Sequence, residues 1–215
     1  MALVAKQPTE IFICNTSNID SMRHGRPQTV MLKEANIPNA LQGELPNGPI
    51  VALVGTQETS DDSKPGNILD HVNSVTIGCA DGKAAEKFIV VSPEIRVEQY
   101  RRIDNSIAGH MLVANETYTA YELQLRDRIE YSLDYFADED IREALSNPVA
   151  AQGLVGTATL FNMNEQGKLE KDGAALRIVS VREQSKPLMY APHAQGKEAA
   201  LMHAPVIMVK LEVIA

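Results

Sequence analysis

The chain contains only two cysteines, Cys14 and Cys79, and it has no apolar run long enough to cross a bilayer. Each cysteine lies in an apolar, strand-like segment, so we expect two buried free thiols rather than a disulfide. The cysteine and histidine spacing fits no metal site. The first residues, MALVAKQPTE, lack a basic region followed by a long apolar stretch. We therefore expect no signal peptide and synthesis in the cytoplasm.

Positive charge is also scarce, because the formal net charge is −8 over 215 residues. A phosphate backbone needs a positive surface, so this balance argues against a general nucleic-acid binder. Small basic clusters occur near Arg23 and Arg26 and near Arg101, and we interpret them as solvated cations. The remaining composition, 44% apolar and 22% charged, is typical of a globular protein with a real core.

Motifs for catalysis are absent or out of context. Arg23-His24-Gly25 resembles the signature of the histidine phosphatase superfamily, in which the histidine attacks a phosphoryl group. That chemistry needs a buried parallel strand directly before the motif and a second histidine, whereas NIDSM precedes it here. A solvated loop histidine is the better interpretation. We also find no phosphate-binding loop, calcium loop or nucleophile elbow. We therefore expect no enzyme activity, and no catalytic, cofactor or metal site.

The segment YELQLRDRIEYSLDYF (121–136) indicates β structure. Apolar residues occupy every second position, and on a helix they would be spread around the whole circumference. On a strand they would face a core, with Glu122, Glu130 and the other polar residues facing water. Asp127 is the one polar residue among the alternate apolar positions, and an arginine lies on each side of it. We therefore expect a bulge or tight turn there.

Short strand-like segments with Gly, Pro, Asn or Asp turns between them recur along the chain: TEIFIC (9–14), PIVALVG (49–55), HVNSVTIGC (71–79), KFIVVS (87–92), EIRVEQYRRI (94–103), GLVGTATLF (153–161), ALRIVSVRE (175–183) and VIMVKLEVI (206–214). One short helix is expected at about 138–146, capped by Asp138, with Ile141 and Leu145 on one face and Asn147-Pro148 as its stop. This pattern predicts a mainly β fold, an antiparallel β-barrel or sandwich.

Two stretches lack such a pattern. Residues 1–45 contain one strand candidate and then a polar, turn-rich stretch, which we interpret as an extended N-terminal arm. Residues 183–205 are expected to form a long excursion. The β-barrel or sandwich domain is then residues 46–215.

The order of features over residues 47–214 resembles small head-associated structural proteins of tailed bacteriophages, which often serve as capsid decoration proteins. The segments that carry the resemblance are NGPIVALVG (47–55), VVSPEIRVEQY (90–100), AYELQLRDRIEYSL (120–133), GLVGTATLF (153–161), ALRIVSV (175–181) and VIMVKLEVI (206–214). The chain departs from the family pattern at Arg126, where a glycine is expected before the Asp.

The resemblance implies a virion structural protein, made in the host cytoplasm, that stabilises or decorates the capsid. Its partners would be the major capsid protein or neighbouring virion subunits, with a homo-oligomer and with neither nucleic acid nor membrane. We expect the arm to make the contacts, through Met22, Arg23, Arg26, Met31 and Ile37. The alternatives are a cellular β-barrel that binds a ligand or partner, and a phosphatase-type hydrolase using His24.

Overall fold

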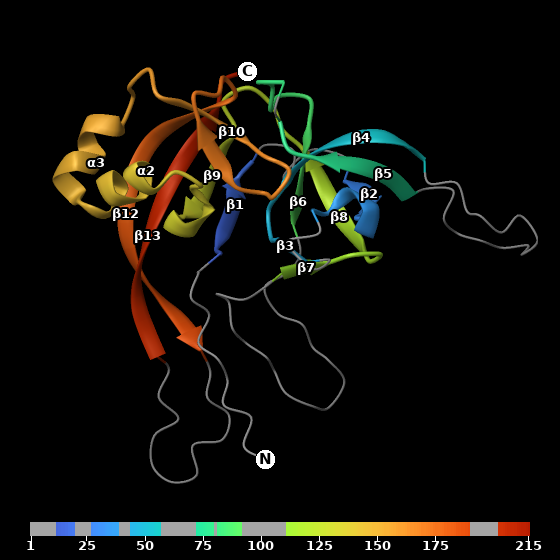
Figure 1. The fold of residues 1–215 in the computed structure, drawn as a ribbon, viewed down its shortest axis with the longest axis horizontal. Helices are drawn as coiled ribbons and strands as arrows, with labels where there is room; N and C mark the ends of the chain where they lie inside the picture. Colours follow the sequence, from blue (N-terminus) through green and yellow to red (C-terminus); the bar gives the residue numbers. More distant parts are fainter. Residues whose placement is uncertain are drawn as a thin grey trace, which may run out of the picture.

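The computed structural model describes residues 12–19, 27–38, 44–56, 72–79, 81–91, 111–189 and 202–215. In these ranges the protein consists of a closed five-stranded barrel, a six-stranded sheet, a short two-stranded sheet and two α-helices (Figure 1). The predicted mainly β architecture with a barrel is therefore confirmed.

The barrel is built from short strands in the order β2 (Gln28–Met31), β5 (Val72–Ile77), β4 (Ile50–Thr56), β6 (Phe88–Val91) and β8 (Thr117–Glu122). Only β2 and β5 pair in parallel; the other neighbours in the barrel are antiparallel. Fully buried side chains from alternating strand positions fill the interior, namely Val30, Val51, Val75, Val90 and Ala120. The two-stranded sheet, β3 (Glu44–Pro46) with β7 (Met111–Val113), adds Leu45 and Leu112 to the same core.

The six-stranded sheet is antiparallel throughout. Its strand order is β1 (Cys14–Asn18), β9 (Arg128–Ser132), β13 (Met202–Val213), β12 (Leu176–Met189), β10 (Leu160–Met163) and β11 (Leu169–Lys171). One face, here called the inner face, carries buried side chains such as Ile129, Tyr131, Val209 and Leu211. This face shares one apolar core with the two helices and with Ile50 and Ile89 of the barrel. The opposite face is called the outer face.

The segment 121–136 forms β8, a turn, β9 and a 3-10 turn η5 (Leu133–Tyr135), which confirms β structure there. The turn expected at Asp127 is also confirmed. The Asp127 carboxylate accepts a hydrogen bond from the Gln124 N–H at 2.8 Å, and Arg126 has φ +75°. Three side chains differ from the expected pattern, and one of them is Ser132, which is buried although it was expected to face water. Leu125 is 61% exposed because it lies in the turn, and Glu130 is buried.

The predicted helix is α2 (Glu139–Ser146), and it buries Ile141 and Leu145 as expected. Asp138 is its N-cap residue, but its carboxylate accepts a hydrogen bond from the Lys171 N–H (2.9 Å) rather than from the helix. α2 ends at Ser146, directly before Asn147-Pro148, as predicted. The strand expected at 153–161 was predicted wrongly, because a second helix, α3 (Pro148–Leu154), follows and β10 begins only at Leu160. Pro148 begins α3 because proline suits the first turn of a helix. Asn147 caps α3 by accepting from the Val149 N–H at 3.0 Å.

The division into a separate arm and a barrel domain needs correction in the described part of residues 1–45. β1 lies at the edge of the six-stranded sheet, and β2 closes the barrel between β5 and β8. A 3-10 turn, η1 (Glu34–Asn36), follows β2 and is held by a hydrogen bond from the Asn36 side chain to the Val75 carbonyl (2.6 Å). Residues 27–38 thus belong to the barrel.

The excursion expected at 183–205 also needs correction at both of its ends. β12 continues to Met189 and β13 begins at Met202, and the two strands pair along this length. Figure 1 shows β12 and β13 as a long twisted pair that runs past the rest of the sheet. The strand candidate at 94–103 lies outside the described residues.

Candidate interaction site

Part of the outer face of the six-stranded sheet carries charged side chains, whereas farther along the same side of β13 Met208 and Val206 are buried with Ile13. Along β13, Lys210 and Glu212 alternate with Val209, Leu211 and Val213, which are all fully buried. In register with Lys210 and Glu212 lie Glu130 and Arg128 of β9. The period of two places these charges on one surface of the sheet.

Glu130 lies at the centre of this surface, and its side chain is only 5% exposed. One carboxylate oxygen lies 2.6 Å from an Arg182 guanidinium nitrogen, and the other lies 3.1 Å from Lys210 Nζ. The Asn15 side-chain amide donates a further hydrogen bond at 3.0 Å. Four adjacent strands, β1, β9, β13 and β12, therefore meet at one carboxylate. Such an arrangement satisfies the buried charge, which would otherwise be costly.

The protonation equilibrium of Glu130 reflects two opposing effects. Burial alone would raise the pKa of its carboxyl, but hydrogen bonds and charge from Arg182 and Lys210 outweigh burial and lower the pKa below its ordinary value. The carboxylate is therefore ionised at neutral pH, and the cluster formed by Glu130, Arg182 and Lys210 carries one excess positive charge.

A second group of ion pairs lies on the same face of the sheet, near the end of β13. Glu212 accepts a hydrogen bond from Arg177 of β12 at 2.8 Å, and its other oxygen lies 3.7 Å from an Arg128 guanidinium nitrogen. The hydrogen bond from Arg177 is the largest effect on this carboxyl and lowers its pKa, and Arg128 adds to it. Two arginines thus share one carboxylate, which leaves a second excess positive charge.

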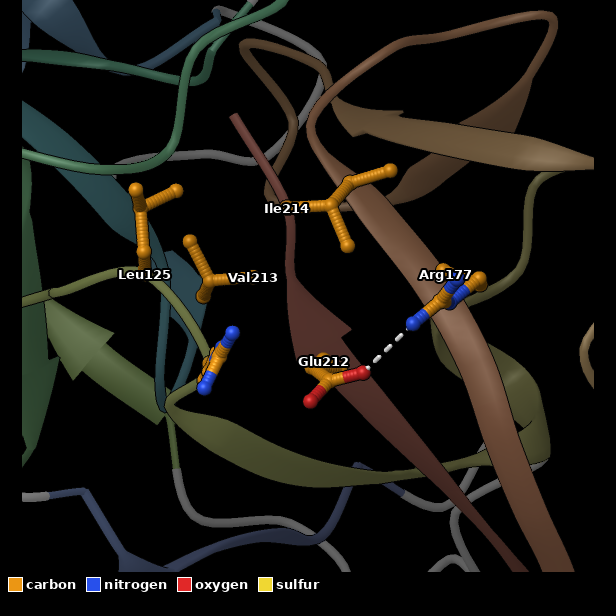
Figure 2. A pocket seen from close by; sticks show the side chains of 6 residues that line it. Leu125, Arg177, Glu212, Val213 and Ile214 are labelled. Atoms are coloured by element: carbon orange, nitrogen blue, oxygen red, sulfur yellow. Dashed lines mark hydrogen bonds and ion pairs between the residues drawn. The ribbon is translucent and has the colours of Figure 1, made fainter.

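A pocket of about 220 Å³ opens beside these ion pairs, and Figure 2 shows Arg177 and Glu212 on one side of it with Leu125 and Val213 opposite. Arg126 and Ile214 complete the lining. The turn that carries Leu125 and Arg126 is fixed to β13, since the Arg126 N–H donates to the Val213 carbonyl at 2.8 Å. The pocket therefore presents an exposed leucine and arginine on a rigid turn.

Taken together, the part of the outer face around Glu130 and Glu212, with Arg126 at the pocket, is basic on an acidic protein. Its cations are Arg126, Arg128, Arg177, Arg182 and Lys210, and its carboxylates are Glu130 and Glu212. This is a surplus of three positive charges in a chain whose formal net charge is −8. Glu170 of β11 lies on the same face but outside this group, at the far edge of the sheet. The arginines are about half exposed, so their remaining N–H donors are accessible to a partner. We refer to this surface as the basic face.

Of the contact residues expected from the sequence, the two that the structure describes, Met31 and Ile37, lie in the barrel and not on the basic face. Met22, Arg23 and Arg26 lie outside the described residues. Met31 is half-buried in β2, and Ile37 is 4% exposed in the barrel core. Ile37 was therefore misassigned as a contact residue, because the segment after β2 folds back onto the barrel.

The sequence did contain a signal for the basic face. In VIMVKLEVI, the charged residues Lys210 and Glu212 are two positions apart between apolar residues, which indicates a strand with one charged face. RIEYS shows the same alternation around Glu130. Considered together, the two patterns indicate that oppositely charged residues of the two strands lie opposite each other. The register that brings Arg177 and Arg182 beside them depends on a bulge in β12 between Ile178 and Ser180, which the sequence does not signal.

Other candidate chemistry finds little support in the described ranges. No group of three or more His, Cys, Asp or Glu side chains there could hold a metal ion, and no helix there is long and apolar enough to cross a membrane. Cys14 and Cys79 are buried free thiols, as predicted, and burial is the main cause that raises the pKa of Cys79. The Arg23-His24-Gly25 motif lies outside the described residues.

Comparison with known proteins gives no relative. No family model, no curated protein and no solved structure matches this chain.

Proposed function

We propose that this chain is a structural protein of the tailed-phage head, a capsid decoration or head-stabilising protein that acts by protein–protein contacts. The resemblance of residues 47–214 is the starting point. Its segments 47–55, 120–133, 175–181 and 206–214 lie mainly on strands of the barrel or of the six-stranded sheet. The segment 153–161 begins in α3 and reaches β10 only at Leu160, and residues 92–100 lie outside the described residues. In this proposal the partners are the major capsid protein or neighbouring virion subunits, and the site of action is the virion.

The observation that carries the proposal is a ribbon formed by the distal parts of β12 and β13. We define the ribbon as Glu183–Met189 paired with Met202–Ile207. β9 pairs with β13 only between Met208 and Glu212, and β10 pairs with β12 only at Leu176 and Arg177. Among the described strands, none flanks the ribbon on either edge. The ribbon therefore projects beyond the sheet that anchors it (Figure 1).

An isolated two-stranded ribbon is marginally stable in water, so a projecting one gains stability when a partner surface packs on it. Pro187 and Pro205 lie within the ribbon, paired with His203 and Ser185. A proline has no N–H to donate, so an additional strand cannot pair continuously along these edges. The ribbon therefore resists uncontrolled strand addition, and we expect one of its faces to pack against a folded neighbour.

The rest of the fold provides a stiff base for such a contact. The barrel and the sheet share one apolar core, and the Glu130 cluster ties four strands together at the base of the ribbon. Stiffness limits the conformational entropy that is lost on docking. On a shell with many equivalent sites, weak individual contacts add up through avidity.

A co-sedimentation experiment tests the proposal. Head shells assembled from the major capsid protein of the phage that the proposal assigns to this chain are mixed with the full chain and centrifuged. We expect saturable binding at a fixed ratio to the shell subunit. A matched variant replaces residues 185–205 with Asn-Gly, which joins Gln184 to Val206. Because these two residues face each other in register, a two-residue turn closes the shortened hairpin.

The shortened variant should keep its circular dichroism spectrum and lose most of its binding to the shells. A control with the surface substitution Glu165→Arg, in the turn between β10 and β11, should bind like the unmodified chain. If the full chain never sediments with the shells at any ratio, the proposed function is wrong.

A further inference from the structure

The basic face has a complementary surface on the same chain. On α2, Glu139 and Glu143 are exposed and lie four residues apart, so their carboxylates share one side of the helix. Within the described part of the chain, neither carboxylate forms an ion pair, whereas their neighbour Asp140 pairs with Lys171 at 2.8 Å. These two carboxylates are free to bind an external cation.

An apolar side chain accompanies each of the two surfaces. Val149, at the start of α3, is 82% exposed, and α3 packs against α2. Leu125 is 61% exposed and lines the pocket. Large apolar side chains with this exposure are costly to leave in water and favour burial against a partner. Each surface thus combines a net charge with one exposed apolar residue: the basic face keeps its surplus of cations beside Glu130 and Glu212, and α2 carries Arg142 between its two exposed glutamates.

The two surfaces cannot meet within one molecule. α2 contributes Ile141 and Leu145 to the core that contains Leu176 and Ile178, so it lies over the inner face of the sheet. Arg177 follows Leu176 and therefore points to the outer face, where the pocket lies. Figure 1 shows α2 and α3 to one side of β12 and β13. Any contact between the acidic helix surface and the basic face must join two copies.

We propose that the basic face of one copy binds the acidic surface of α2 and α3 on a second copy. Glu139 and Glu143 of one copy lie against Arg126 and the neighbouring arginines of the next, and Val149 covers Leu125. The contact is head-to-tail, because the two surfaces differ, so repetition gives a ring or an open chain according to the rotation between copies. This inference rests on the proposed function, since lateral contacts between copies are what would stabilise a shell.

A nucleic acid is a less suitable occupant of the basic face. The surplus of three positive charges is surrounded by a chain of net charge −8, which repels a long polyanion. A pair of carboxylates on a short helix matches the small size of the pocket and the fork geometry of arginine. Exposed ion pairs contribute little each, so the free protein should associate weakly and with a strong dependence on salt.

Charge-swap variants test the inference through sedimentation velocity of the full chain. Arg126→Glu reverses a side chain at the pocket, and Glu143→Arg reverses one on α2. The unmodified protein should associate reversibly at low salt and less at high salt. Each variant alone should associate at least about tenfold more weakly, because like charges then face each other. An equimolar mixture of the two variants should regain association, since each altered surface now meets its complement.

The matched control is Glu165→Arg, an exposed residue in the turn between β10 and β11, which should leave association unchanged. Unaltered thermal unfolding of all variants excludes loss of the fold. The inference is overturned if the unmodified protein remains monomeric at low salt and high concentration, if Arg126→Glu has no effect, or if the mixture does not recover.

The head co-sedimentation experiment separates this inference from the proposed function. Binding to heads by a protein that stays monomeric contradicts only the contact between copies. Self-association without any binding to heads contradicts only the proposed function. If Arg126→Glu reduces binding to the heads and leaves self-association intact, the basic face binds the shell and not a second copy.

Discussion

The Tyr131 hydroxyl donates a hydrogen bond to the Gly48 carbonyl oxygen at 2.8 Å, although the two residues are 83 positions apart in the sequence. Tyr131 belongs to β9 of the six-stranded sheet, and Gly48 lies between β3 and β4 at the edge of the barrel. The neighbouring Tyr135 hydroxyl donates to the Asn47 carbonyl in the same way. Two tyrosines therefore fasten the sheet to the barrel inside the common core.

Replacing Tyr131 with Phe should destabilise the protein without changing its fold. The Gly48 carbonyl is buried and loses its donor, which costs about 1–3 kcal/mol of unfolding free energy. Equilibrium urea unfolding measures the difference. Tyr121→Phe, a half-buried tyrosine of β8, is the control and should change stability by much less. Equal effects of the two substitutions would show that the Tyr131 hydroxyl does not hold the junction.

Gly48 itself should not tolerate a side chain. Its φ is +89°, and an added Cβ would lie 2.4 Å from Cys14 Sγ, which is far inside contact distance. Backbone strain and overpacking each cost about 1–3 kcal/mol, so Gly48→Ala should strongly lower the denaturation midpoint. Gly153→Ala makes an opposite control, because Gly153 lies in α3 with no atom near the added Cβ. That substitution should stabilise slightly, by about 0.5 kcal/mol.

Glu130→Gln should change both stability and its dependence on pH. The folded-state pKa of Glu130 is lowered, while an unfolded glutamate titrates at about pH 4.3. A lowered pKa contributes stability above the unfolded pKa, and this contribution is lost as pH falls through the folded pKa. The unmodified protein should therefore be more stable than the variant at pH 7, by about 1–3 kcal/mol. The difference should shrink below about pH 5.

Urea unfolding of both proteins across this pH range measures that difference directly. Glu212, Asp81 and Asp140 also have lowered pKa values, but they are common to both proteins and cancel in the comparison. Glu139→Gln, which removes an exposed carboxylate, is the control and should change stability at pH 7 by much less. If the difference in unfolding free energy between Glu130→Gln and the unmodified protein stays constant from neutral to acid pH, ionised Glu130 is not the source of that difference.

The sequence predicts the strands well where one face of the strand is buried and the other is exposed to solvent. The alternation predicts that Glu130 faces water, which is wrong. Alternation alone cannot show that Arg182, on a strand about 50 residues later in the chain, covers this side of β9. It also misses α3. Proline at 148 is compatible with the end of one helix and with the start of the next, and only the cap formed by Asn147 distinguishes them.

The basic face could be predicted only in part for the same reason. The alternation around Lys210 and Glu212 is visible in the sequence, but the partner strands and their register follow from tertiary packing. The contact role expected for Ile37 failed because a polar, turn-rich stretch was interpreted as an arm. One buried side chain every few residues is enough to fix such a segment on a barrel, as Val30, Leu32 and Ile37 do.

Hydrogen–deuterium exchange of the chain, free and bound to head shells, tests the central claim most directly. Contact through the ribbon predicts slower exchange on binding at residues 183–189 and 202–207, with little change in barrel strands such as β4. Unchanged exchange throughout the ribbon in a protein that is bound to shells would contradict the account.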